Sequence, residues 1–72
     1  MFDLVEFGKR LRLARQATGL SMDKVAQVVG GTHGTLSKYE NGKVYPLIDR
    51  VYDLAALYGC SIDWLCGVED DE

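Results

Sequence analysis

The stretch that decides the fold is SMDKVAQVVGGTHGTLSKYENG, residues 21–42. Ser21 can cap a helix, because its hydroxyl can accept a hydrogen bond from one of the unpaired N–H groups of the first turn. A Gly-Gly pair interrupts the apolar pattern at residues 30–31, and Thr32 then offers a second cap. Gly42 can take the left-handed conformation in which many helices end. The stretch therefore predicts two short helices joined by a tight turn.

Two short helices joined by a glycine-containing turn are typical of a helix-turn-helix motif. Three more helices are expected around them, over residues 3–18, 47–58 and 61–66. The chain has 72 residues, which is enough for one domain only. The single proline and the scarcity of alternating apolar and polar residues argue against a β structure. We therefore expect a compact all-α fold of five helices, with the motif formed by the second and third.

Apolar residues recur at helical spacing in the first and fourth of these helices. The stripe of the first consists of Leu4, Phe7, Leu11 and Ala14. The stripe of the fourth consists of Ile48, Val51, Leu54, Ala55 and Tyr58. Pro46 suits the first position of the fourth helix, because proline has no N–H to lose there. Arg10 and Arg12 are expected on a solvated face of the first helix.

Charge is divided unevenly along the chain, whose net charge is −3. Residues 1–43 carry seven basic and four acidic side chains, a net charge of +3, whereas residues 44–72 carry one basic and seven acidic, a net charge of −6. This asymmetry predicts a basic face in the first half and an acidic end turned away from a polyanion. We expect the domain to span residues 1–67 and the acidic tail, residues 68–72, to be disordered.

Several classes of site are not expected. Cys60 and Cys66 lack CxxC spacing, and His33 is the only histidine, so neither a zinc site nor a disulfide framework is predicted. No carboxylate pair, nucleophile–base pair or phosphate-binding loop indicates an enzyme, a cofactor or a small-molecule site. No apolar run is long enough for a membrane span, and the N-terminus does not resemble a signal peptide. We therefore expect a cytoplasmic protein.

A set of motifs extends over residues 7–67. They are FGxxLRxxR from residue 7, GLS from residue 19, VA at residues 25–26, LSxYENGK from residue 36, Pro46, LA at residues 54–55, and GxSxDxLxG from residue 59. This pattern resembles the lambda-repressor-like helix-turn-helix family, also called Cro/C1-type or XRE-type. The resemblance implies a bacterial or phage regulator of transcription, often a repressor, that binds double-stranded DNA. It also implies a dimer on an operator with two-fold symmetry.

The resemblance further implies that the third helix, residues 32–41, enters the major groove. The positions that would face the bases are His33, Gly34, Ser37 and Lys38. Lys38 can donate to guanine, and His33 can donate to or accept from a base edge or a phosphate. The candidates for phosphate contacts are Ser21, Thr32, Thr35, Asn41, Lys43 and Tyr45.

Two structural roles are also implied by the family. Arg15 late in the first helix would pair with Glu40 and hold the third helix in place. A dimer surface could include Tyr52, Leu57, Trp64 and Val68, which a small core does not need. In the alternative interpretation, Trp64 only covers the core.

Three positions differ from the family pattern, of which the smallest departure is Leu47, where a Ser or Asp cap would be usual. Met22 stands where relatives commonly have a glutamine that contacts phosphate, and Gly34 lies inside the third helix. Gly34 either lets the backbone approach DNA closely or marks a surface relaxed for DNA reading. The alternative function is a helix-turn-helix module whose third helix binds another protein.

Overall fold

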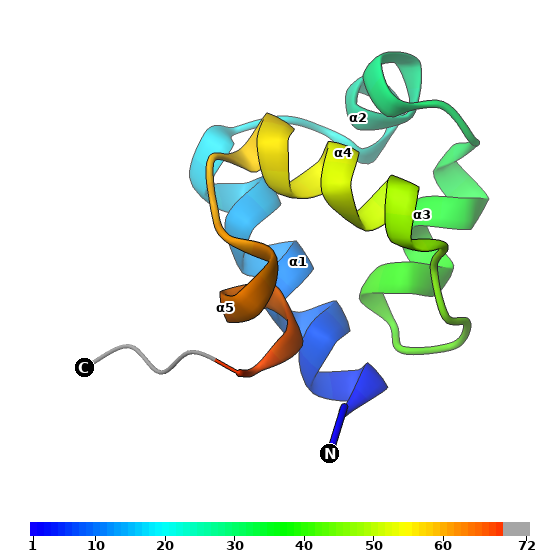
Figure 1. Cartoon of the computed structure of the whole chain (residues 1–72). Coiled ribbons are helices and arrows are strands. Elements are labelled where there is room, and N and C mark those ends of the chain that lie inside the picture. Colours follow the sequence, from blue (N-terminus) through cyan, green and yellow to red (C-terminus); the bar gives the residue numbers. More distant parts are fainter. Residues whose placement is uncertain (69–72) are drawn as a thin grey trace.

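The computed structural model describes residues 1–68 and shows five helices joined by short loops (Figure 1). They are α1 (Leu4–Thr18), α2 (Met22–Val29), α3 (His33–Glu40), α4 (Ile48–Tyr58) and α5 (Ile62–Cys66). Within the described residues there is no strand, so the expected all-α fold of five helices is confirmed. Of the tail expected to be disordered, residues 69–72 lie outside the described residues.

Local side-chain hydrogen bonds define where four helices begin. The N-cap side chains of Asp3, Ser21, Thr32 and Ser61 each accept a hydrogen bond from a backbone N–H in the first turn that follows. These caps satisfy donors that have no partner inside the helix. α4 is the exception, because Leu47 occupies its N-cap and has no side chain that can accept a bond.

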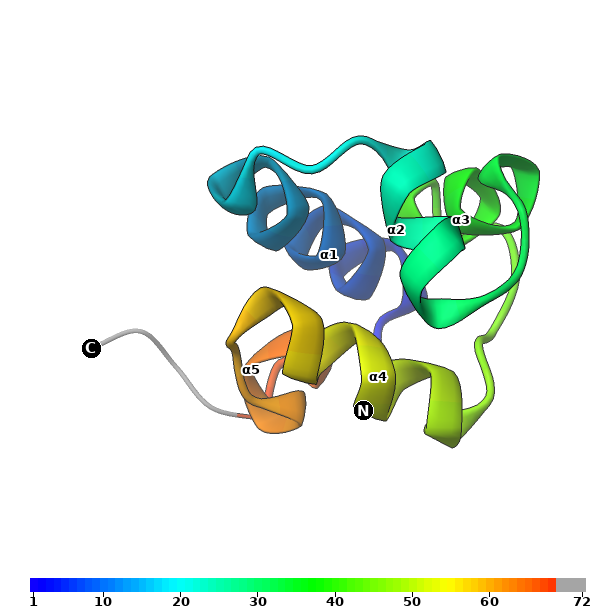
Figure 2. The same ribbon diagram turned by 90° about the horizontal axis from the view of Figure 1, so that it is seen from above.

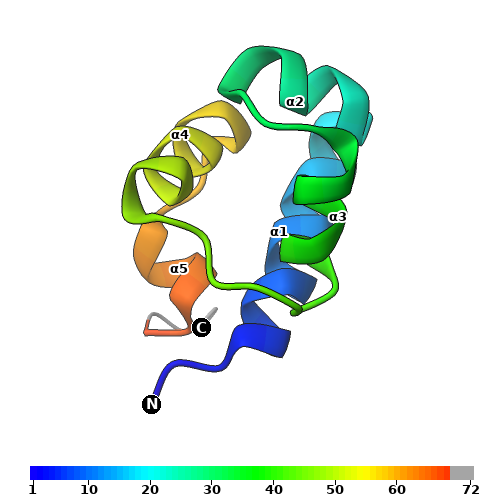
Figure 3. The ribbon, with the colours of Figure 1, turned by 90° about the vertical axis from the view of Figure 1, so that its right-hand side faces the viewer.

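The core lies where α1, α4 and α5 meet the α2–α3 pair. Figure 2 shows α2 and α3 next to one another at one edge of the molecule. Figure 3 shows α1 and α3 side by side, with α4 facing them and α2 crossing one end. The side chains that are almost completely buried are Phe7, Leu11, Val25, Leu54 and Leu65. Because α3 packs on α1 and α2, one of its faces is left free of the core.

The beginning of α4 differs from the prediction. The helix starts at Ile48, and Pro46 lies before the N-cap residue Leu47 rather than at the first helical position. The carbonyl of Leu47 accepts the first helical hydrogen bond, from the N–H of Val51. Ile48 is 73% exposed and does not belong to the buried stripe. Periodicity identifies one side of a helix, but it does not show how far neighbouring elements extend along that side.

Arg10 also differs from the prediction. Its guanidinium lies over the Trp64 ring, 5.2 Å from the ring centroid, and its Nη1 donates to the Trp64 carbonyl over 2.6 Å. It also forms an ion pair with Glu6. Arg10 therefore packs α1 against α5 instead of lying on a solvated face, whereas the side chain of Arg12 is 47% exposed.

Gly8 lets α1 and α3 approach each other closely. A Cβ atom at this position would lie 2.5 Å from the Glu40 carbonyl oxygen and 2.6 Å from that of Tyr39. Any side chain there would collide with the backbone at the end of α3. The absence of a side chain at Gly8 therefore determines how near the third helix lies to the first.

Candidate nucleic-acid interface

The outer face of α3 is the exposed part of the helix-turn-helix. Leu36, Tyr39 and Glu40 are buried on the inner face. His33, Gly34 and Lys38 are exposed, and Thr35 and Ser37 are half-buried. The structure therefore places the four residues predicted to face the bases, His33, Gly34, Ser37 and Lys38, away from the core.

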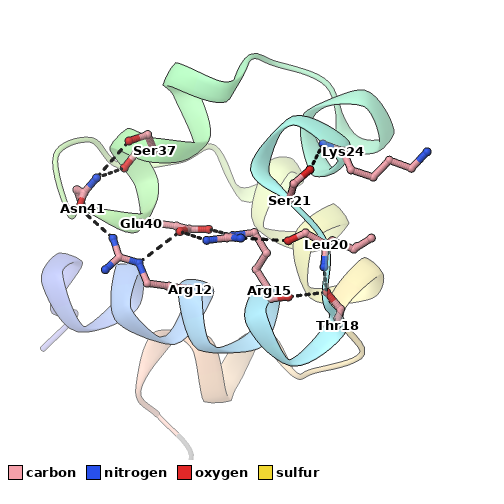
Figure 4. Close-up of polar contacts among 9 residues, drawn as sticks. All are labelled: Arg12, Arg15, Thr18, Leu20, Ser21, Lys24, Ser37, Glu40 and Asn41. Atoms are coloured by element: carbon pink, nitrogen blue, oxygen red, sulfur yellow. Dashed lines mark hydrogen bonds and ion pairs between the residues drawn. The ribbon is translucent and has the colours of Figure 1, made fainter.

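Glu40 anchors α3 to α1 through two arginines (Figure 4). Arg15 donates from Nε to Oε2 over 2.6 Å and from Nη2 to Oε1 over 3.1 Å, and its Nη1 donates to the Leu20 carbonyl. Arg12 Nε lies 3.5 Å from Oε1. The Glu40 side chain is only 4% exposed and that of Arg15 only 14%, so water screens the pair weakly. The hydrogen bond to Glu40 raises the pKa of Arg15, against the opposing effect of burial.

Asn41 extends this network to the outer face of α3. Its Oδ1 accepts from Arg12 Nη2 over 3.1 Å, and its Nδ2 donates to the Ser37 carbonyl over 2.8 Å and to Ser37 Oγ over 3.2 Å (Figure 4). The sequence places Ser37 and Asn41 one helical turn apart, which is a signal for a side-chain contact. No such signal indicated Arg12, because it belongs to another helix. A phosphate contact by the Asn41 side chain would have to form beside these hydrogen bonds.

Three of the predicted phosphate-contacting hydroxyls, those of Ser21, Thr32 and Thr35, lie at helix starts. Ser21 Oγ accepts from the N–H of Lys24 over 3.1 Å. Thr32 Oγ1 accepts from the N–H of Thr35 over 3.1 Å and lies 3.1 Å from the Thr35 hydroxyl. A hydroxyl that accepts from the backbone keeps its own O–H as a donor. The cap role and a phosphate contact are therefore compatible.

The loop between α3 and α4 carries the two remaining phosphate candidates. Lys43 and Tyr45 are both exposed, Tyr45 by 74%. The ring of Tyr45 lies 6.1 Å, centroid to centroid, from that of Phe2. The loop thus presents a cation and a phenol hydroxyl to solvent immediately after α3.

Two contacts of the helix-turn-helix were not predicted. Arg50 of α4 donates from Nη1 to the carbonyl of Gly30 over 2.9 Å, which ties the turn between α2 and α3 to α4. Gly31 has a φ of 93°, and a Cβ atom there would lie 2.6 Å from the same guanidinium. His33 Nδ1 lies 2.9 Å from Asp23 Oδ1. Both contacts join residues that are ten or more positions apart in the sequence, so no local pattern indicates them.

The four residues suggested for a dimer surface have different environments. Tyr52 and Val68 are 64% and 77% exposed, whereas Leu57 and Trp64 are half-buried and pack against the core. Leu57 lines a shallow groove between α2 and α4, and Val68 lines a second hollow next to Phe2. Trp64 packs against the core and also contacts Arg10. Its half-buried side chain is compatible both with a place in a dimer surface and with covering the core only.

The described residues contain no cluster of histidine, cysteine and acidic side chains that could hold a metal ion. Cys60 and Cys66 are free, half-buried thiols, and burial raises the pKa of each. Within residues 1–68, no helix is long and apolar enough to cross a membrane.

A family model described as HTH_3: Helix-turn-helix matches residues 11–65. The chain belongs to this helix-turn-helix family. A curated relative, the uncharacterized HTH-type transcriptional regulator YobD of Bacillus subtilis (strain 168), is 35% identical over 63 residues, which cover 88% of this chain and 56% of YobD. The chain therefore spans little more than half the length of this relative.

Solved structures show the same fold. The restriction-modification controller protein C.AhdI from Aeromonas hydrophila superposes with a TM-score of 0.80 at 32% identity, covering 88% of this chain and 91% of C.AhdI. The P22 c2 repressor, solved in complex with a synthetic operator, superposes with a TM-score of 0.81 at 22% identity, covering 88% of this chain and 96% of the repressor. The lambda-repressor-like fold implied by the sequence motifs is therefore confirmed.

Proposed function

We propose that this helix-turn-helix protein is a sequence-specific regulator of transcription that represses by binding double-stranded DNA. The observation that carries the proposal is the outer face of α3: exposed polar and basic side chains on a helix whose inner face is anchored through the buried Glu40. A helix of this kind fits the major groove, where side chains can reach base edges. The regulators among its relatives and the operator complex of the P22 c2 repressor support this function.

His33, Gly34, Ser37 and Lys38 are the proposed base-contacting residues. Lys38 is a donor only, so it favours the acceptors O6 and N7 of guanine. Ser37 Oγ already accepts from Asn41 and keeps its O–H to donate. Gly34 has no side chain to contribute, and its position lets the backbone of α3 come close to DNA.

Phosphate contacts are proposed on both sides of α3. Ser21, Thr32 and Thr35 lie at the starts of α2 and α3, and Asn41, Lys43 and Tyr45 lie at the end of α3 and in the loop that follows. Such contacts fix the register of α3 on the duplex and supply the salt-dependent part of the affinity.

We further propose that two copies bind an operator with two-fold symmetry. The exposed apolar side chains of Tyr52 and Val68 favour an interface between copies, with Leu57 and Trp64 at its edge. The proposed role is non-enzymatic and needs no cofactor or small molecule. The proposed location is the cytoplasm, because that is where DNA lies in a bacterium or a phage-infected bacterial cell. The alternative of a protein-binding module is not favoured, because the relatives are transcriptional regulators.

The decisive experiment is selection from random duplexes followed by a salt series on the selected site. We expect one preferred sequence and an affinity that falls steeply as salt rises. Lys43→Ala should lower the salt slope by about one, whereas Lys38→Ala should weaken binding by roughly 1–3 kcal/mol and relax the preference at one base pair. Lys9→Ala, at an exposed position on α1, is the matched control. If DNA is not retained even at low salt, the proposed function is wrong.

A further inference from the structure

Asp23 contacts His33, one of the proposed base-contacting residues, but is not itself proposed to contact a base. It lies in the first turn of α2, and its Oδ1 is 2.9 Å from Nδ1 of His33, the first residue of α3. The two side chains are ten residues apart in the sequence and meet across the turn of the motif. Both remain accessible, because 56% of the His33 side chain and 75% of the Asp23 side chain are exposed.

The chemistry of this contact determines which nitrogen of His33 carries the proton. The ionised carboxylate of Asp23 can only accept hydrogen bonds. Nδ1 of His33 must therefore be the donor. A neutral imidazole has one N–H only, so Nε2 of the neutral side chain is left as an acceptor.

We infer that Asp23 is a positioning residue that sets the base preference of this protein through His33. With Nε2 as an acceptor, neutral His33 favours a base that offers a donor in the major groove, which is the N4 amino group of cytosine or the N6 amino group of adenine. Guanine and thymine present only hydrogen-bond acceptors there, so they are disfavoured at this position. Lys38 has the opposite preference, because it can only donate. This inference rests on the proposed DNA-binding function.

The tautomer can be measured directly in the free protein. His33 is the only histidine, so the ring ¹⁵N signals of the full chain have a single source. At mildly alkaline pH, we expect the neutral form of the imidazole to carry its proton on Nδ1, and we expect Asp23→Ala to move much of it to Nε2. The matched control is Asp63→Ala, which removes an acid from the first turn of α5 and should leave the signals unchanged. A wild-type side chain protonated at Nε2 would overturn the inference.

Selection from random duplexes then tests the effect on reading. The base pair read by His33 is the one whose preference disappears in His33→Ala. We expect the wild type and Asp63→Ala to select cytosine or adenine at this position. In Asp23→Ala, we expect the discrimination against guanine to fall by roughly fivefold or more. If the base preference changes in His33→Ala but not in Asp23→Ala, the inferred role of Asp23 is refuted and the proposed DNA-binding function is not. Absence of DNA binding by the wild type refutes the proposed function and this role together.

Discussion

Glu40 is the only charged residue that is buried among residues 1–68. Its carboxylate is held by two hydrogen bonds from Arg15 and by the more distant Arg12. A buried ion pair costs desolvation energy, and its main value is often to specify one arrangement. Here that arrangement is the position of α3 on α1. The same residue therefore connects the stability of the fold to the placement of the proposed reading surface.

Replacing Glu40 should be far more damaging than replacing an exposed acid. Glu40→Ala leaves the Arg15 guanidinium buried without its partner, which should lower the free energy of unfolding by roughly 3–5 kcal/mol. Asp53→Ala, an exposed acid in α4, should change it by less than about 0.5 kcal/mol. Thermal unfolding followed by circular dichroism measures the difference. Equal melting temperatures for the two variants would contradict this role for Glu40.

The Tyr58 phenol should ionise at a higher pH than an unperturbed tyrosine. Burial, with a further contribution from Glu40, raises its pKa from 10.0 to about 12. In the unfolded chain Tyr58 loses its proton near pH 10, so its contribution to stability is complete below that pH and is lost as the pH rises towards 12. The stability of the wild type should therefore fall over this window more steeply than that of Tyr58→Phe. Chemical unfolding of both proteins across the window measures this, and parallel curves would show that Tyr58 is not responsible.

At the scale of the elements, the close contact between α1 and α3 decides where the proposed reading helix lies. Gly8 permits the approach, and Arg12 and Arg15, about one and two turns further along α1, supply the charges that hold the end of α3. Arg50 similarly ties the turn before α3 to α4. The third helix is therefore fixed at both ends by residues that lie outside it.

Alanine at two glycine positions should have opposite effects on stability. Gly8→Ala pushes α3 away from α1, because its Cβ would collide with two backbone carbonyls, and should cost about 1–3 kcal/mol. At Gly34 a Cβ would meet only Thr32 Oγ1 at 3.7 Å, so Gly34→Ala should stabilise α3 by up to about 1 kcal/mol. Melting temperatures measure both effects. A more stable Gly34→Ala protein with weaker DNA binding would support close approach of the backbone, and unchanged binding would argue against it.

At the scale of the whole molecule, charge and exposed apolar surface are distributed unevenly. The basic excess belongs to residues 1–43, which include the entire helix-turn-helix, and the acidic excess belongs to the rest of the chain. The half of the sequence that contains the motif is therefore the half whose net charge favours contact with a polyanion. The large exposed apolar side chains of α4, Ile48 and Tyr52, lie on a helix that does not belong to the motif. The proposed DNA-reading helix and these exposed apolar side chains therefore belong to different helices.

Tyr52→Asp should separate association from folding. The side chain is 64% exposed, so its replacement should leave the melting temperature of dilute protein nearly unchanged. If Tyr52 lies in the interface between copies, the variant should shift from dimer to monomer in sedimentation velocity experiments and bind a two-fold-symmetric site less tightly. Asp53→Ala, at the neighbouring position, is the control. An unchanged association of Tyr52→Asp would place the interface elsewhere.

The sequence by itself determined the local features of this protein. The helix starts at Ser21, Thr32 and Ser61 were predictable, because a capping side chain and its backbone partner are three residues apart. The five helices followed from spacing and from glycine positions. The pairing of Arg15 with Glu40 followed from a family resemblance and not from physical reasoning on the residues.

Only the tertiary structure decided which side chains meet across helices. Pairing of Asp23 with His33, Arg10 with Trp64 and Arg50 with Gly30 depends on the packing angles of whole helices, which no local pattern encodes. The exposure of Ile48 was likewise mispredicted, because the elements that bury Val51 on the same helix leave the Ile48 side chain uncovered. The stretch of residues 21–42 thus specifies two helices and a turn. Contacts from α1 and α4 place the reading helix, and Asp23 sets the hydrogen-bonding chemistry of its partner His33.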